Sequence, residues 1–207
     1  MELEVRRIST ASDPGQLELS HEKLQLLRPD LYGLAGMWHS IKVKLGQAWD
    51  QKKQVARQLL TGDSRAAVVI SVAPLLVAAY TDELDCIAML QFPNQLVGQG
   101  GLKIGSRLLT VNFYDDDCAL ARDLFPGPKN TKRWTNFGPL IADFLTLDQQ
   151  RLQHRKQQIS ESEWQRTVAM GQEYLKRHPN KSRDGRPIYS WDPAESLAPQ
   201  LTPWRPN

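Results

Sequence analysis

Three apolar runs of strand length follow one another in the middle of the chain, and they constrain the fold more than any other feature of the sequence. The runs are residues 66–72, 75–81 and 86–92. Short turns containing Pro or Asp separate them, as is typical of antiparallel strands. The apolar residues are continuous rather than alternating, so both faces of the strands should be covered. With a fourth segment at 102–113, the pattern predicts an antiparallel β meander over about residues 65–114.

The segment before these runs predicts a long amphipathic helix over residues 31–60. Its apolar residues recur mostly three or four positions apart, with Lys, Arg and Gln between them, which is the spacing of one helical face. They are Leu34, Met37, Trp38, Ile41, Leu45, Trp49, Val55, Leu59 and Leu60. Gly62 then ends the helix, because glycine tolerates the left-handed conformation that follows a last turn. We expect this helix to cover the sheet.

Further helices are predicted on either side of the meander, which makes the fold class α+β. A short helix should span 21–27 and end before Pro29. After the sheet we expect a short helix over 118–125, an apolar helical face from Leu140 to Leu147, and a terminal helix that begins at a capping box after Ser160 and ends before Pro179. The Gly-rich residues 93–101 are interpreted as a hairpin loop. Helices from both ends of the chain should therefore cover the sheet.

The composition indicates one folded domain with less regular ends. The chain has 207 residues, of which 41% are hydrophobic and 24% charged, close to ordinary globular usage. Residues 1–20 are interpreted as a flexible arm or one edge strand, 21–178 as a single α+β domain, and 179–207 as an extended tail rich in Pro and Trp.

Charge, cysteines and apolar runs exclude several classes of protein. A net charge of +3 is far below the basic excess that by itself indicates a nucleic-acid-binding protein. Cys86 and Cys118 stand in no Cys/His pattern, so we expect buried, reduced thiols and neither zinc nor another cofactor. No apolar run reaches the length of a membrane span and the first residues are charged, so we expect a cytoplasmic protein without a membrane partner.

Two acidic clusters are the only candidates for an enzymatic site. They consist of Asp82, Glu83 and Asp85 at one strand junction and of Asp115, Asp116 and Asp117 after another strand. Closely spaced carboxylates can hold Mg²⁺, so a metal-dependent phosphodiesterase or nuclease is one hypothesis. The alternative is that the first cluster forms a turn and the second caps a helix. No nuclease, kinase or phosphatase spacing surrounds them, and we assign no metal and no catalytic residue.

A basic segment near the end of the chain is a candidate for anion or nucleic-acid binding. Its cations are Lys176, Arg177, Lys181, Arg183 and Arg186. Cations that neutralise phosphates, followed by aromatic residues that can stack on bases, would allow sequence-tolerant binding of a nucleic acid. The alternative is a solvated helix end, where cations also suit the negative pole of the helix.

The aromatic residues of the tail favour a different function. Tyr189, Trp191 and Trp204 lie among few other apolar residues, so their burial requires either a partner or docking on the chain's own domain. Aromatic, Pro-rich segments commonly dock in grooves of partner proteins. The leading hypothesis from the sequence is therefore a non-enzymatic protein-interaction module or complex subunit with a protein partner.

Overall fold

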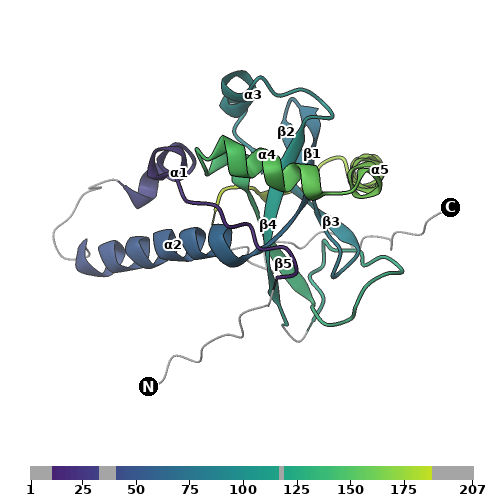
Figure 1. Cartoon of the computed structure of the whole chain (residues 1–207), viewed down its shortest axis with the longest axis horizontal. Helices are drawn as coiled ribbons and strands as arrows, with labels where there is room; N and C mark the ends of the chain where they lie inside the picture. Colours follow the sequence, from purple (N-terminus) through teal and green to yellow (C-terminus); the bar gives the residue numbers. More distant parts are fainter. Residues whose placement is uncertain (1–10, 33–40, 117–118, 188–207) are drawn as a thin grey trace.

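The described residues contain six strands, which form one curled sheet in the computed structural model of the chain (Figure 1). The structure describes residues 11–32, 41–116 and 119–187, without the side chains of residues 41–48. The strands are β1 (Asp63–Val72), β2 (Leu75–Thr81), β3 (Cys86–Phe92), β4 (Arg107–Asp115), β5 (Asn136–Ile141) and β6 (Arg183–Asp184). Their order is β5-β4-β1-β2-β3-β6, and each neighbouring pair is antiparallel except β3 and β6. The predicted α+β class is confirmed.

Strands β1, β2 and β3 form the meander that the apolar runs predict. Every residue of β2 is buried, and so is every residue of β3 except Gln91. The fourth strand does not continue next to β3. It returns to the other side of β1, where Ser64 lies opposite Val111. The connection contains a short helix, α3 (Gln95–Gly100), in the segment interpreted as a plain hairpin loop.

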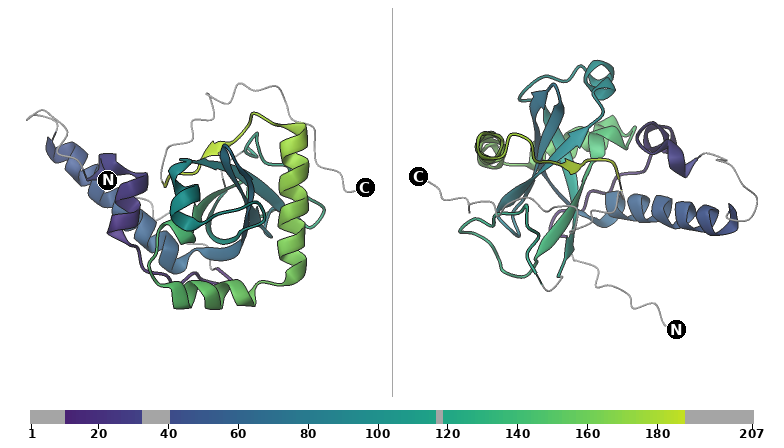
Figure 2. Two further views of the ribbon diagram at one scale, coloured as in Figure 1. Left: turned by 90° about the horizontal axis from the view of Figure 1, so that it is seen from above. Right: turned by 180° about the vertical axis from the view of Figure 1, so that it is seen from behind.

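The two faces of the meander are covered in different ways. Helix α5 (Glu161–Arg177) packs across β1, β2 and β3. On α5, Gly171 permits this approach, because a Cβ there would lie 2.7 Å from Ile70 Cδ1 and 2.8 Å from the Cβ of Ala78. Strand β2 also contacts β5, which is not its neighbour in the sheet, so the sheet curls over on itself (Figure 2). The expectation that helices supply all of the cover is therefore only partly right.

Arg183 connects the two edges of the curled sheet. It lies on edge strand β6, and its Nη1 donates a hydrogen bond of 2.8 Å to the carbonyl oxygen of Phe137 on edge strand β5. The same guanidinium forms a bidentate ion pair with Asp123, and its side chain is only 9% exposed. Gly185 extends the contact by donating its N–H to the carbonyl oxygen of Gln91. The folded part of the chain therefore continues past residue 179, where we expected the tail to begin.

Two helices begin where the sequence predicts, whereas the elements between β4 and α5 differ from the prediction. Ser20 caps α1 (His21–Leu27) by accepting from Lys23 N, and Ser160 caps α5 by accepting from Glu163 N. The described residues 119–125 form no helix, and the apolar stretch from residue 140 begins in strand β5 and continues as η2 (Ala142–Phe144). Pairing with β4 outweighs the helical spacing there. Pro139 is compatible with β5 because an edge strand can lack one N–H.

Helix α2 (Ile41–Thr61) covers the sheet only with its C-terminal end. Val55 and Leu59 are fully buried, and Gln58 donates to the carbonyl oxygens of Val111 and Gly138. The N-terminal part of α2 projects away from the sheet beside α1 (Figures 1 and 2). The prediction that the whole helix covers the sheet is wrong. Of its predicted residues 31–60, Leu31 belongs to a separate 3-10 turn and 33–40 lie outside the described residues.

The segment before α1 is attached to the domain rather than free. Its backbone donates from Gly15 N to Gly62 O and from Leu17 N to Leu59 O. The side chain of Leu17 is 1% exposed. Residues 1–20 were interpreted as a flexible arm or one edge strand. Within this segment, residues 13–17 bind the junction between α2 and β1 through backbone hydrogen bonds and a bridge from Pro14 to Asp63.

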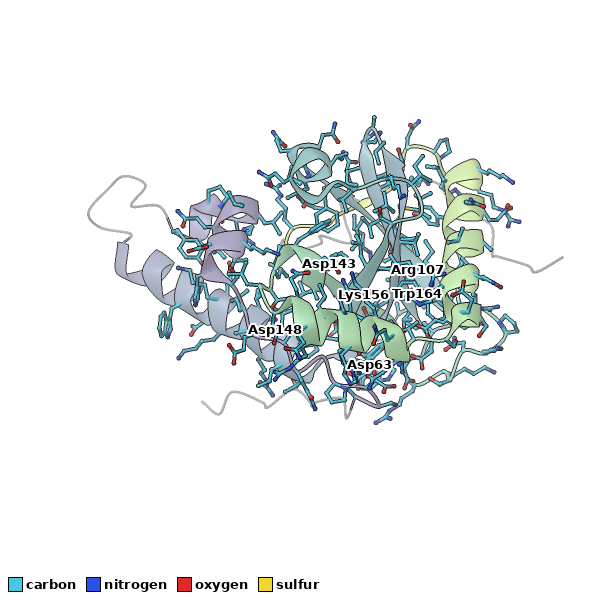
Figure 3. All side chains as sticks on the ribbon, turned by 45° about the horizontal axis from the view of Figure 1, so that its top comes forward. Asp63, Arg107, Asp143, Asp148, Lys156 and Trp164 are labelled. Carbon is cyan, nitrogen blue, oxygen red and sulfur yellow. The ribbon has the colours of Figure 1, made fainter. Side chains whose placement is uncertain are left out.

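Partly buried lysines connect the remaining helices to the sheet. From α4 (Gln149–Gln158), Lys156 Nζ binds Asp143 Oδ1 at 2.5 Å and the carbonyl oxygen of Arg107 at 3.0 Å (Figure 3). The other carboxylate oxygen of Asp143 accepts from Leu109 N on β4. On α1, Lys23 donates to the carbonyl oxygens of Asp143 and Thr146, and burial lowers its pKa. Arg28 completes this side by pairing with Asp30 of η1 (Pro29–Leu31).

Candidate interaction surface

Asp85, from the first acidic cluster, is a buried structural anchor. Its carboxylate is fully buried and accepts two hydrogen bonds from Arg166 of α5, at 2.7 and 2.6 Å. Tyr80 Oη and the backbone N–H of Lys129 donate to the same carboxylate. Asp85 also has a positive φ of 49°, which fits the tight turn between β2 and β3. These contacts fix the turn against α5 and leave the carboxylate without access to solvent.

Asp82 belongs to a second group of charges centred on Arg65. The Arg65 side chain is 10% exposed, and its guanidinium lies 2.7 Å from Asp82, 3.0 Å from Asp63 and 3.0 Å from Asp13. Tyr114 donates a hydrogen bond to Asp63. Burial, together with the nearby Asp82 carboxylate, raises the pKa of Asp63 to about 6 although Arg65 opposes the shift. Arg65 therefore holds three carboxylates from separate parts of the chain.

The second acidic cluster does not join the first in a metal site within the described residues. There, no group of three or more His, Cys, Asp or Glu side chains is placed to hold a metal ion. Asp115 ends β4, and its carbonyl oxygen accepts from Thr135 N. Asp116 follows the strand, and Asp117 lies outside the described residues. Asp82 and Asp85 instead bind the arginines of the folded core.

Most cations of the basic segment are paired with carboxylates of the same domain. Arg177 pairs with Glu173 at 2.6 Å, and Lys176 lies 4.0 Å from the same side chain. Arg186 pairs with Asp184, and Arg183 is the buried residue that joins the sheet edges. Lys181 lies in the turn after α5, where its N–H donates to the carbonyl oxygen of His178. Arg183 is thus a structural residue rather than a surface cation.

The predicted partner-binding aromatics and one of the cysteines lie outside the described residues. Tyr189, Trp191 and Trp204 are in residues 188–207, and Cys118 is also not described. Cys86 is the buried free thiol that we expected, and burial raises its pKa well above the ordinary value. A thiol of this kind is unreactive.

The outer face of α2 presents large apolar residues to solvent. Trp49 is 60% exposed and Leu60 is 52% exposed. They are eleven residues apart, which places them within about 20° of each other around the helix axis. Lys53 and Ala56 lie between them at helical spacing, and Lys53 Nζ is 5.2 Å from the centre of the Trp49 ring. We call the four residues Trp49, Lys53, Ala56 and Leu60 the α2 surface.

The sequence pattern did not reveal this surface, because Trp49 and Leu60 were assigned to the same apolar face as Val55 and Leu59. A helical projection separates them. Trp49 lies about 120° from Val55 and about 80° from Leu59 around the axis, so the helix has two apolar rows rather than one. The row of Val55 and Leu59 is buried against the domain. The other row is the signal that could have identified the α2 surface.

Comparisons with known proteins identify no family for this chain. No protein-family model matches it, and no solved structure matches it. Over 87 residues the chain is 31% identical to phosphoglycerate kinase from Mycoplasma pneumoniae. That stretch is 41% of this chain and 21% of the kinase, so the chain spans about one fifth of the length of that enzyme. Among the described residues, no helix is both long enough and apolar enough to cross a membrane.

Proposed function

We propose that this protein is a protein-interaction module, a subunit that binds another protein through the α2 surface. The observation that carries the proposal is the exposure of Trp49 and Leu60 on one face of a helix that projects from the sheet. Tryptophan dominates the binding energy of many interfaces, because it buries a large area at a low cost in side-chain entropy. A helix with an apolar row on its outer side suits recognition of a second helix or groove.

The surroundings of the carboxylates also favour a binding function over the metal-dependent hydrolase. A hydrolytic metal site needs oxygen ligands that are not already bound to arginine. Asp85 is held by Arg166, and Asp82 by Arg65. The same reasoning weakens the nucleic-acid hypothesis, because Arg177, Arg183 and Arg186 have carboxylate partners in the domain.

The tail remains part of the proposal as a second contact. We propose that Tyr189, Trp191 and Trp204 act as anchors for the same partner. The structure determines where a truncation that tests this must end. A chain that stops after Asn180 loses β6 and Arg183, whereas a chain that stops after Pro187 keeps both. Only the second truncation separates partner binding from folding.

Site-specific photo-crosslinking in the native cell tests the proposal. A photoreactive amino acid replaces Asp50, which is exposed beside Trp49, and in a control strain it replaces Lys103, which is exposed in the loop before β4. We expect a discrete adduct with one protein from position 50 that is absent from position 103. The adduct should disappear in the Trp49→Asp background and weaken in the chain that ends at Pro187.

Two results would contradict the proposal. One is an equal pattern of adducts from both positions, and the other is the absence of any protein adduct at position 50. Unchanged thermal unfolding of Trp49→Asp is the control for folding, since substitutions of exposed residues usually change stability by less than about 0.5 kcal/mol. An adduct that survives in the chain ending at Pro187 but not in Trp49→Asp would assign binding to the α2 surface and reject the tail as a contact.

A further inference from the structure

The α2 surface has the residue spacing of a helix-packing site. When two helices pair, a side chain from one inserts between four residues of the other at positions i, i+3, i+4 and i+7. Lys53, Ala56, Arg57 and Leu60 have this spacing, and Ala56 is the smallest of the four. Trp49 lies seven residues before Ala56, or about 10 Å along the axis. A partner helix would therefore place two apolar residues on this face, also about seven residues apart.

The charged residues on this face of α2 indicate which residues should flank the two apolar residues of the partner helix. Lys53 and Arg57 are exposed on successive turns, and neither has a carboxylate partner within the described part of the chain. Asp50 is the only acidic side chain among the exposed residues from Trp49 to Leu60. Interfaces are arranged so that opposite charges meet, and like charges placed opposite each other oppose association. The complementary surface is therefore acidic.

The same charges argue against a second copy of this chain as the occupant. Two α2 helices packed antiparallel through Ala56 would bring Lys53 of one copy close to Arg57 of the other. Such a pair is repulsive, and Asp50 alone cannot neutralise both cations. A nucleic acid would satisfy the cations but would leave Leu60 without an apolar partner.

We infer that the α2 surface recognises an amphipathic helix of a partner protein with two apolar residues, for Trp49 and for the space over Ala56, and with carboxylates opposite Lys53 and Arg57. This inference rests on the proposed function and specifies the class of partner. The apolar contacts provide most of the affinity, and the carboxylates select the orientation and discriminate against basic helices.

A displayed library of helical peptides provides the test. Peptides are selected for binding to the full chain, and the selected peptides are then tested against each variant. We expect enrichment of Asp and Glu around apolar residues spaced seven apart. Binding of the selected peptides should weaken about tenfold or more in Trp49→Asp and in Lys53→Glu, as for central residues of an interface. Lys103→Glu makes the same charge change in the loop before β4 and should leave binding unchanged. A second selection against the double variant Lys53→Glu, Arg57→Glu should enrich basic peptides instead.

Four results would overturn the inference. The first is enrichment of peptides without acidic residues, and the second is binding that Trp49→Asp does not change. The third is a dimer in sedimentation equilibrium that Trp49→Asp dissociates, which would assign the surface to a second copy. The fourth is tighter binding of mixed-sequence single-stranded RNA than of any selected peptide, lost in Lys53→Glu. An adduct from position 50 in cells, combined with no acidic preference, would reject this inference and leave the proposed function intact, whereas no adduct would reject the proposed function itself.

Discussion

Arg183 on edge strand β6 donates a hydrogen bond to the carbonyl oxygen of Phe137 on the opposite edge strand, β5. The two residues are 46 positions apart in the sequence. Through this bond and the ion pair with Asp123, a single side chain keeps the curled sheet closed. The relationship also explains why a residue from a basic, polar stretch is buried.

Replacing Arg183 should therefore destabilise the fold. We expect Arg183→Ala to lower the free energy of unfolding by about 3 kcal/mol, because it removes the bond to Phe137 and leaves the largely buried Asp123 carboxylate without its cation. Urea titration followed by far-ultraviolet circular dichroism measures the change. Arg186→Ala is the matched control, since its pair with Asp184 is more exposed and should contribute less than about 1 kcal/mol. Equal effects of the two substitutions would show that Arg183 does not hold the sheet.

The pair formed by Arg166 and Asp85 should be a second point of high sensitivity. We expect Arg166→Ala to cost about 3 to 5 kcal/mol, because the fully buried Asp85 carboxylate then keeps only Tyr80 and one backbone N–H as donors. Arg177→Ala, on the same helix, removes a more exposed ion pair with Glu173 and serves as the control. Thermal unfolding of the two variants measures the difference. If Arg166→Ala unfolded at the same temperature as Arg177→Ala, Asp85 would not be the anchor described above.

Gly171 should not tolerate a side chain. We expect Gly171→Leu to destabilise the protein by about 2 kcal/mol or more, because the added atoms must displace Ile70 and Ala78 where α5 crosses β1 and β2. Gln172→Leu places the same residue at the next, exposed position and should change stability little. Denaturant midpoints of both variants test this. A Gly171→Leu protein as stable as the Gln172→Leu protein would mean that α5 does not pack this closely.

Asp63 should make stability fall as the pH rises through the weakly acidic range. In the unfolded chain an aspartate releases its proton near about pH 4, whereas in the folded protein burial holds the proton up to about pH 6. Between these values the folded state binds more protons, so the free energy of unfolding decreases with increasing pH, by an amount of the order of 2 kcal/mol. Above the folded pKa the loss is complete.

Asp63→Asn isolates this contribution from other groups in the same range, such as Glu163, whose pKa is also raised by burial. We expect the variant to show a flatter pH dependence of the urea midpoint between about pH 4 and about pH 6. Asp50→Asn, which neutralises an exposed carboxylate on α2, should retain the slope of the parent protein. A slope that Asp63→Asn leaves unchanged would assign the pH dependence to a different group.

The sequence predicted local structure well where one physical signal dominates. The continuous apolar runs identified β1, β2 and β3, and the capping box at Ser160 identified the start of α5. These features depend on residues that are close in the sequence. The stretch from Leu140 to Leu147 was misassigned as one helical face, because its first residues belong to β5, whose pairing with the separate strand β4 outweighs local spacing.

The candidate site depended on information that a linear pattern does not hold. Whether Trp49 faces the core or solvent is decided by how far α2 reaches across the sheet, and Val55 and Leu59 already fill that contact. Likewise, the sequence could not show that Asp85 meets Arg166 or that Arg183 meets Asp123, because each pair joins elements far apart in the chain. The clusters of charged residues in the sequence therefore suggested a metal site and an anion-binding site, whereas Asp85 and Arg183 are paired within the domain.

Closure of the sheet has a consequence for the behaviour of this chain at high concentration. Strands as apolar as β1, β2 and β3 are templates for intermolecular β pairing when an edge is open, and this pairing leads to aggregation. Here the edge next to β4 is a strand interrupted by Pro139, the edge next to β3 is a strand of two residues, and Arg183 joins the two. Strand order keeps β1 and β2 at interior positions, so loss of that one arginine would expose chiefly the edge of β3, which pairs with β6 only at Leu90 and Gln91, to neighbouring molecules.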